Sequence, residues 1–187
     1  NNIINESGNT ITIGASGDTI ALAGTTVTGI TQGITMVDQF ALTSNFSLSN
    51  GENIITANLA RVSNGESPGF IGTGMTESSG IFTFPSTGIY MITFNAYASS
   101  SAAALYNTRQ IQVTLNNSSY ATAASSDGNF YTGTSYDSSP VQYILDVTDT
   151  ANVKVRFRID GQGTNTTLLG NSGTNDTSFT FIRLGDT

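Results

Sequence analysis

The sequence predicts an all-β protein, an antiparallel sandwich or barrel preceded by a short repetitive β stem. Thr, Ser, Asn and Gly dominate the chain, and Ala, Leu, Glu and Lys never gather at helical spacing, so no amphipathic helix is expected. From about Met36 onward, short runs of alternating apolar and polar residues follow one another closely. Turn clusters at 49–51, 63–65 and 115–117 stand between these runs, which is typical of sandwiches and barrels.

Residues 1–36 are the predicted stem. Two short alternating stretches in it superpose, so that Ile11 matches Ile20 and Ile13 matches Leu22. Short strands closed by Gly-rich turns are typical of solenoids and intertwined fibre shafts. Because each strand has few large side chains, such a stem needs neighbouring copies of the chain to bury its apolar edge. The alternative interpretation is a flexible Gly/Ser/Thr linker.

Residues 37–187 are the predicted head, in which the strands are longer and more apolar. The expected strands, in chain order, are Phe40–Leu48, Thr56–Val62, Ile81–Phe84, Gly88–Ala98, Arg109–Leu115, Ser119–Ala124, Val141–Val147, Asn152–Ile159 and Ser178–Leu184. The clearest is Gly88–Ala98, whose alternation places Tyr90, Ile92 and Phe94 on one face.

The last expected strand carries apolar residues on both sides. Phe179 and Phe181 point to one face, and Ile182 and Leu184 point to the other. A strand of this kind is typically covered on both faces. The middle of a trimer would provide that second cover.

One stretch of the head resembles a known family. Gly80 to Phe94 carries the pattern G-x-F-T-x-P-x-x-G-x-Y followed by alternating apolar residues, and resembles that stretch of complement C1q-like globular heads, relatives of the tumour necrosis factor (TNF) jelly roll. Residues 175–184 resemble the closing strand of the family, and residues 112–117 a strand that ends in an Asn-Gly-like turn. In a further hairpin, Thr150 and Ala151 replace the usual Gly-Asp.

This resemblance covers roughly residues 37 to 187. It implies an antiparallel jelly-roll sandwich, C1q/TNF-like, that assembles as a homotrimer around a shared axis. The matching Gly80 and Gly88 also permit turn conformations closed to other residues, and Pro85 ends a strand because it has no N–H. The residues expected in the fold and trimer core are Phe82, Phe84, Tyr90, Ile92, Phe94, Phe179 and Phe181.

The stem and the composition narrow the class of protein that this resemblance implies. The stem has no Gly-X-Y repeat, which argues against an animal complement protein. Abundant Thr, Ser, Asn and Gly, absent Cys, scarce Lys and a repetitive β stem resemble bacteriophage tail fibres and other virion appendages, where C1q-like heads also occur. The resemblance implies a location on the virion, and the alternative is a secreted or cell-surface protein.

Composition argues against several classes of function. The chain has no His and no Cys, which removes the commonest general base, the commonest zinc ligands and the thiol nucleophile, so we expect no enzyme. Six basic residues face thirteen acidic ones, giving a net charge of −7, which disfavours nucleic acid and anionic membranes as partners. No apolar run reaches the ~18 residues of a membrane-spanning helix, so membrane insertion is not expected.

Aromatic residues in the loop-rich middle of the head are the candidate receptor-facing residues. They are Tyr106, Tyr120, Phe130, Tyr131 and Tyr136. Exposed aromatic rings can stack on sugars while a tyrosine hydroxyl forms hydrogen bonds. The alternative interpretation is that most of them close the ends of the sandwich or the trimer interface.

Charged residues offer two further candidates. Asp146 and Asp149 could form a calcium site, although no calcium-binding motif is present, and no other cofactor is expected. Lys154, Arg156 and Arg158 share one face of a strand. That face is either simply solvated, or it binds an acidic polysaccharide or a neighbouring acidic subunit.

The leading hypothesis is a trimeric phage fibre head that binds a host-cell surface glycan or protein during adsorption. A second hypothesis is a structural protein, a capsid decoration or fibre-assembly component, whose partner is the virion itself. A third is a bacterial or spore-surface C1q-like protein. Each is a binding or structural role, since the composition argues against catalysis.

Overall fold

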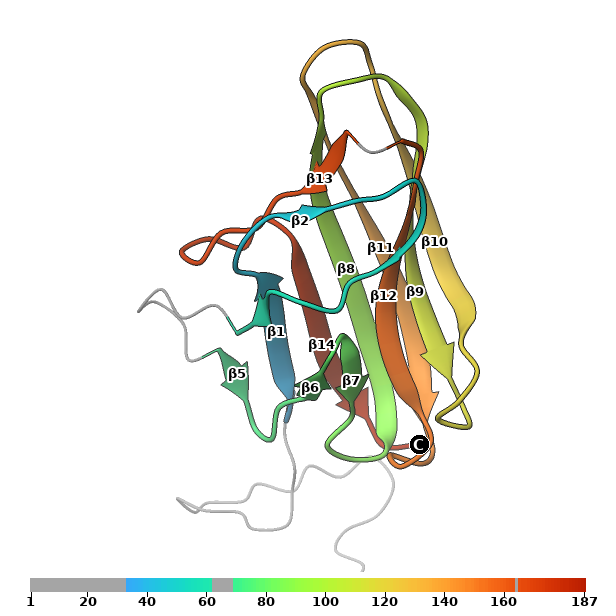
Figure 1. Cartoon of the computed structure of the whole chain (residues 1–187). Helices are drawn as coiled ribbons and strands as arrows, with labels where there is room; N and C mark the ends of the chain where they lie inside the picture. The colour runs from blue at the N-terminus through green and yellow to red at the C-terminus, as the bar shows by residue number, and fades with distance from the viewer. Residues whose placement is uncertain (1–32, 62–68, 164) are drawn as a thin grey trace, which may run out of the picture. The chain divides into compact units, whose positions relative to one another are not determined.

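The computed structural model describes residues 33–61, 69–163 and 165–187. These residues belong to one compact unit, Gly33–Thr187, and form fourteen strands in two antiparallel sheets with no helix (Figure 1). The all-β prediction is confirmed. Of the predicted stem only residues 33–36 fall within the description; the superposed repeats, with Ile11, Ile13, Ile20 and Leu22, lie outside it.

The first sheet is built on four neighbouring strands in the order β11 (Ser135–Val147), β8 (Gly88–Ser100), β14 (Ser178–Gly185) and β1 (Val37–Leu42). Four short strands extend it. At one end of β8, β13 and then β2 are added, while β4 and β5 pair with β1. Their bounds are β2 (Phe46–Ser47), β4 (Leu59–Ala60), β5 (Phe70–Ile71) and β13 (Thr166–Leu168).

The second sheet runs in the order β10, β9, β12, β7 and β6, and β3 also pairs with β12. The bounds are β3 (Gly51–Ile54), β6 (Thr76–Ser78), β7 (Ile81–Thr83), β9 (Ala104–Thr114), β10 (Ala121–Phe130) and β12 (Lys154–Gly161). Every strand pair in both sheets is antiparallel. The two sheets stack face to face, with β10 and β11 along the same side (Figure 1).

Aromatic rings form the centre of the core. Phe82 has four ring neighbours, Phe40, Phe157, Phe179 and Phe181, with centroids 5.1 to 6.1 Å away. These rings come from both sheets and pack edge-on or tilted, the geometries that aromatic pairs prefer. All seven residues predicted for the core are buried, at 0 to 2% exposure. On the other side of β14, Ile182 is half-buried and Leu184 is 51% exposed.

Several expected strand ends are wrong. The expected strand Phe40–Leu48 is interrupted between β1 and β2, and of Thr56–Val62 the described part forms only the two-residue β4. The expected strand Ser119–Ala124 is displaced and longer, since β10 runs from Ala121 to Phe130, and the expected strand Asn152–Ile159 extends as β12 to Gly161. Gly128 lies within β10, and a larger residue would not fit there, because a Cβ would collide with the side chains of Asp137 and Arg109.

No helix among the described residues is long and apolar enough to cross a membrane. The chain enters the described unit beside the start of β1, and the C-terminus lies at the same end of the sandwich (Figure 1). The loops after β8 and β10, residues 101–103 and 131–134, project at the opposite end (Figure 1). We call this loop end the apex.

Candidate functional site

Four exposed apolar and aromatic side chains belong to the strand ends and the loop at the apex. Leu105 and Tyr106 follow the first residue of β9, Tyr131 follows β10 directly, and Tyr136 is the second residue of β11. Their exposed fractions run from 44% for Tyr106 to 82% for Leu105. The ring of Tyr136 stacks on Tyr97 of β8, with centroids 6.0 Å apart and planes inclined by 28°. We call these four residues the apical surface.

The apical surface offers contact area with few rotatable bonds. Tyrosine rings pack on sugar faces or apolar side chains while their hydroxyls form hydrogen bonds, which suits recognition of a glycan or a protein. Three of the five candidate receptor-facing residues, Tyr106, Tyr131 and Tyr136, therefore belong to the same end of the sandwich. Leu105 was not among those candidates; its position beside the Ala-rich turn gives no sequence signal of exposure.

The other two candidate aromatics lie elsewhere. Phe130 is 4% exposed and packs in the core, because its strand pairs with the start of β9 at Ala104 and turns the ring inward. The expectation that Phe130 faces a receptor is therefore wrong, because a buried ring offers no surface to a receptor. Tyr120 lies before β10, with its ring 4.0 Å from the guanidinium carbon of Arg156. Burial raises the pKa of Tyr120.

A buried ion pair lies between the sheets beneath the apex. Arg109 of β9 donates from Nη2 to Asp137 of β11 and from Nη1 to the carbonyl oxygen of Asn107, 3.1 Å away. The Arg109 side chain is fully buried, and that of Asp137 is 22% exposed. Burial lowers the pKa of Arg109, whereas the carboxylates of Asp137 and Asp127 act to raise it. The pair links the two sheets at the side where β10 and β11 meet.

The surroundings of this ion pair are polar. The side chains of Asn107, Ser126 and Ser135 are buried there and have no hydrogen-bond partner among the described residues. Gly128 lies opposite Asn107 in the ladder and leaves the space that the Arg109 guanidinium occupies. The interior beneath the apex is thus polar, whereas the rest of the sandwich is filled by aliphatic and aromatic side chains.

The outer face of the first sheet carries an aliphatic row. Cross-strand register aligns Ile71, Val37, Ile182, Met91 and Ile144, one residue from each of β5, β1, β14, β8 and β11. Ile71 and Ile144 are 53% and 61% exposed, and the other three are half-buried. Directly opposite residues point to the same side of a sheet, so the row forms one continuous apolar stripe.

A second row beside the stripe is polar and uncharged. Gln39, Thr180, Thr93 and Gln142 align across the same four long strands. Gln39 Nε2 donates to Thr180 Oγ1 at 2.8 Å, and Gln142 Nε2 donates to Thr93 Oγ1 at 3.1 Å. Because these side chains bind one another, covering them with protein costs little desolvation. We call the two rows together the lateral face.

An apolar groove of about 430 Å³ lies at the side where β10 and β11 meet. It is lined by Val113, Leu115, Ala121, Thr122, Ala123, Tyr143, Leu145 and Asp146. Leu115 is 69% exposed, so this groove has an apolar rim at the surface. Ile144, the last residue of the lateral stripe, lies on β11 between two groove residues. Apolar surface therefore continues around the edge of the sandwich.

The carboxylates do not form a metal site in the described part of the chain. No group of three or more Asp or Glu side chains is close enough together there to hold a metal ion. Of the calcium candidates, Asp146 lines the groove, and Asp149 accepts hydrogen bonds from the Ala151 N–H and the Asn152 amide at 2.7 and 2.6 Å. The Asn152 amide and the Ala151 N–H lower the pKa of Asp149. Its role in the structure is to stabilise a turn.

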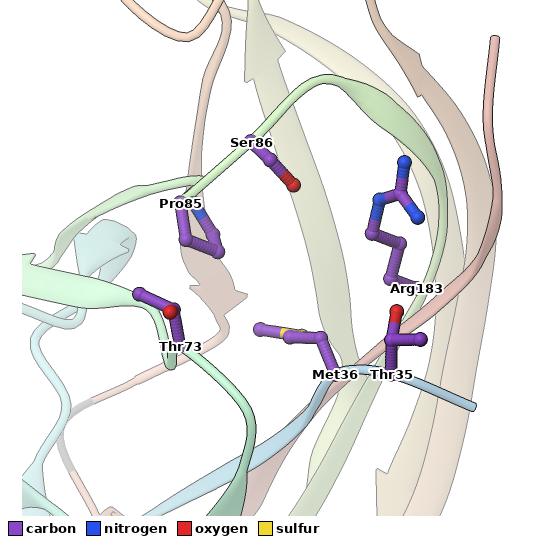
Figure 2. A pocket seen from close by; sticks show the side chains of 6 residues that line it. All are labelled: Thr35, Met36, Thr73, Pro85, Ser86 and Arg183. Carbon is purple, nitrogen blue, oxygen red and sulfur yellow. The ribbon is translucent and has the colours of Figure 1, made fainter. Parts of the chain in front are cut away.

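A smaller cavity, of about 190 Å³, lies where β1 and β8 begin and β14 ends, at the end of the sandwich opposite the apex (Figure 1). It is lined by Thr35, Met36, Thr73, Pro85, Ser86 and Arg183 (Figure 2). Arg183 already donates from Nε to the carbonyl oxygen of Thr87 at 3.1 Å and pairs with Asp186. The cavity therefore offers no unpaired cation to a ligand, and Met36 packs in the core beside it.

Comparison with solved structures identifies the fold. The chain is similar to three crystal structures of murine APRIL, determined at pH 8.5, 5.0 and 8.0, with TM-scores of 0.56, 0.57 and 0.55. The identities are 13%, 12% and 12%, and each alignment covers 80% of this chain and 98% of the murine APRIL chain. The fold is a TNF-like jelly roll. No protein-family model matches the sequence, and no curated protein matches it.

The structural likeness confirms the predicted C1q/TNF-like jelly-roll sandwich. At this level of identity it establishes the fold alone, because one fold hosts many functions. The function must be argued from the apical surface, the lateral face and the groove. The groove was missed from the sequence, and of the lateral face only Ile182 was anticipated, since register between distant strands decides which side chains align.

Proposed function

We propose that the chain is a non-enzymatic, trimeric virion fibre or appendage protein whose jelly-roll head binds a host-cell surface receptor, a glycan or a protein, during phage adsorption. The lateral face is the observation that carries the trimer. The apical surface supports receptor binding, and the composition supports a virion location. The partners are then two further copies of the chain, other virion proteins and the host receptor.

The lateral face and the groove fit a ring of identical copies. A flat stripe on one side of the sandwich and a groove on another can pair head to tail, and a rotation that closes gives a cyclic trimer. Among the described residues β10 pairs with β9 alone and β11 with β8 alone, so two long strands have unpaired edges. Native proteins cover such edges, and a neighbouring copy would cover these.

The substitution Ile144→Lys tests the trimer. Ile144 is exposed in the single chain, so the head should still fold, but a lysine there would be buried without a partner in the trimer. We expect the concentration at which the trimer dissociates to rise by on the order of 100-fold. Light scattering and sedimentation equilibrium measure this.

The matched control is Ile81→Lys, an equally polar change at an exposed isoleucine on the outer face of the second sheet. It should leave the trimer intact. A wild-type chain that is monomeric at micromolar concentration would refute the trimer. Equal effects of the two lysines would show that the lateral face is not the interface.

The apical surface is proposed as the receptor-binding region. A trimer presents three copies of it at one end, which raises avidity without new contacts. The start of β1 and the C-terminus lie at the other end of the sandwich (Figure 1). A head anchored through its N-terminal residues would therefore present these aromatic side chains to a cell surface.

The double substitution Tyr131→Ala and Tyr136→Ala tests receptor binding. Exposed aromatic anchors carry a large share of binding energy at interfaces, so affinity for host cells should fall by on the order of 100-fold. The free energy of unfolding should change by no more than about 1 kcal/mol. Binding of purified labelled head to host cells, and its ability to block infection, are the measurements.

The control is Phe70→Ala, which removes a 41% exposed aromatic ring from β5, away from the apex. It should bind cells as the wild type does. Receptor binding would be refuted if the wild-type trimer neither binds cells nor blocks infection. If the double variant binds cells normally, the receptor-binding region lies elsewhere on the head and not at the apical surface.

A further inference from the structure

Only some of the basic residues of this acidic chain form ion pairs with carboxylates. All six lie in the described residues. Four arginines, Arg61, Arg109, Arg158 and Arg183, form ion pairs with carboxylates. No described carboxylate lies within 4 Å of Lys154 or Arg156. These two cations sit two residues apart on the same face of β12, about 7 Å from each other along the strand.

The Arg156 guanidinium is held in one orientation. The ring of Tyr120 covers one face of it, with 4.0 Å between the guanidinium carbon and the ring centroid. Its Nε donates to Gln112 Oε1 at 2.9 Å, and Gln112 Nε2 donates in turn to Thr122 Oγ1 at 3.3 Å. No described residue accepts a hydrogen bond from its two terminal nitrogens. A guanidinium that is held in one orientation, with both terminal nitrogens free to donate, can bind a carboxylate in bidentate geometry.

On the side of β9 and β10, Arg156 is surrounded by amide and hydroxyl groups, whereas Ile81 of β7 lies directly opposite it on its other side. Thr122 Oγ1 also donates to Gln110 Oε1 at 2.8 Å, so Gln110, Gln112 and Thr122 form a polar ladder beside the guanidinium. Lys154 donates from Nζ to the carbonyl oxygen of Thr150 at 2.6 Å, which leaves further ammonium donors. Such a surface complements a ligand that carries hydroxyls as well as a negative charge.

We propose that the outer face of β12 around Arg156 is a binding site for a carboxylated saccharide, such as a polymer of uronic acid. The carboxylate binds the terminal nitrogens of Arg156. The sugar hydroxyls bind Gln110 and Thr122, the accessible members of the ladder, since Gln112 is buried. The Lys154 ammonium, two residues away on β12, adds electrostatic attraction for the carboxylate. The site lies on the second sheet, so it does not depend on the apical surface or on the lateral face.

Arg156→Gln tests this site. Losing a charged hydrogen-bond donor should weaken binding of polygalacturonate to the full chain by on the order of tenfold, measured by titration calorimetry at fixed ionic strength. Fully methyl-esterified polygalacturonate, which lacks the charge, should bind the wild type at least about tenfold more weakly, for the same loss of a charged hydrogen bond. The thermal midpoint of each variant confirms that it is folded.

The matched control is Arg158→Gln, the same change on the same face at an arginine already paired with Glu52 and Asp160. It should alter binding by less than about twofold, because its charge is already compensated. The proposal is overturned if polygalacturonate does not bind, if the two variants lose affinity equally, or if esterification has no effect. It is also overturned if polyglutamate binds as tightly, since an acidic protein segment would then be the better ligand. Tyr131→Ala should leave this binding unchanged.

Discussion

Asp137→Ala is expected to lower the free energy of unfolding by about 3–5 kcal/mol, because it leaves the fully buried Arg109 guanidinium without its carboxylate. The remaining groups cannot replace it. The neighbouring Ser126 and Ser135 hydroxyls are neutral and cannot compensate the positive charge, and Asn107 already gives its carbonyl oxygen to Arg109. Denaturant unfolding at one fixed protein concentration measures the loss, since trimer formation makes stability concentration-dependent.

Asp127→Ala is the matched control, because it removes the same charge from the neighbouring strand. Asp127 is exposed and accepts a hydrogen bond from Thr108, so its loss should cost less than about 1 kcal/mol. The double variant Arg109→Met, Asp137→Leu should recover much of the stability lost by Asp137→Ala, since apolar replacement of both members of a buried pair is often tolerated. Equal, small losses for Asp137→Ala and Asp127→Ala would show that the pair does not support the fold.

The burial of Arg109 could have been predicted from the alternation of its strand. Arg109, Ile111 and Val113 alternate along one strand, and a period of two places all three on the same face. The structure turns that face inward. A cation in such a row predicts a buried carboxylate partner on another strand, although only the fold can show that the partner is Asp137.

Long strands with strict alternation could be predicted from the sequence. β8 and β14 begin where expected, and their inward residues fill the core, because large apolar residues recur at every second position in Tyr90–Phe94 and in Phe179–Phe181. The short strands β5 and β6 were not predicted, and β2 and β4 were expected only as parts of longer strands, since their two or three residues are strands only through pairing with distant neighbours. The aligned stripe on the lateral face depends on register in the same way.

The candidate binding residues were predicted in part for a related reason. Tyr106, Tyr131 and Tyr136 lie near polar loops, and their strand positions leave them exposed. Tyr120 and Phe130 occupy similar sequence surroundings, yet Tyr120 stacks with Arg156 and Phe130 turns into the core. Local composition predicts a loop region, whereas the partner that an aromatic ring finds there is decided by tertiary packing.

Phe82→Ala is expected to lower the free energy of unfolding by about 3–5 kcal/mol, the range for removing a large buried aromatic side chain. Phe82 comes from the short β7 and contacts rings of β1 and β14 in one sheet and of β12 in the other. Its removal leaves a cavity between the sheets, because four packed neighbours cannot all move to fill it. Denaturant and thermal unfolding both measure the loss.

Two comparisons separate the packing of Phe82 from a general effect of losing an aromatic ring. Phe70→Ala removes the same atoms from an exposed position, where the ring contacts Arg61, and should cost about 1 kcal/mol or less. Phe82→Leu keeps most of the side-chain volume. It should lower the free energy of unfolding less than Phe82→Ala does, because the cavity that it leaves is smaller. If Phe82→Ala were no more harmful than Phe70→Ala, the sheets would be held together by something other than this aromatic cluster. The Arg109–Asp137 pair, which also joins the two sheets, would then carry the larger share.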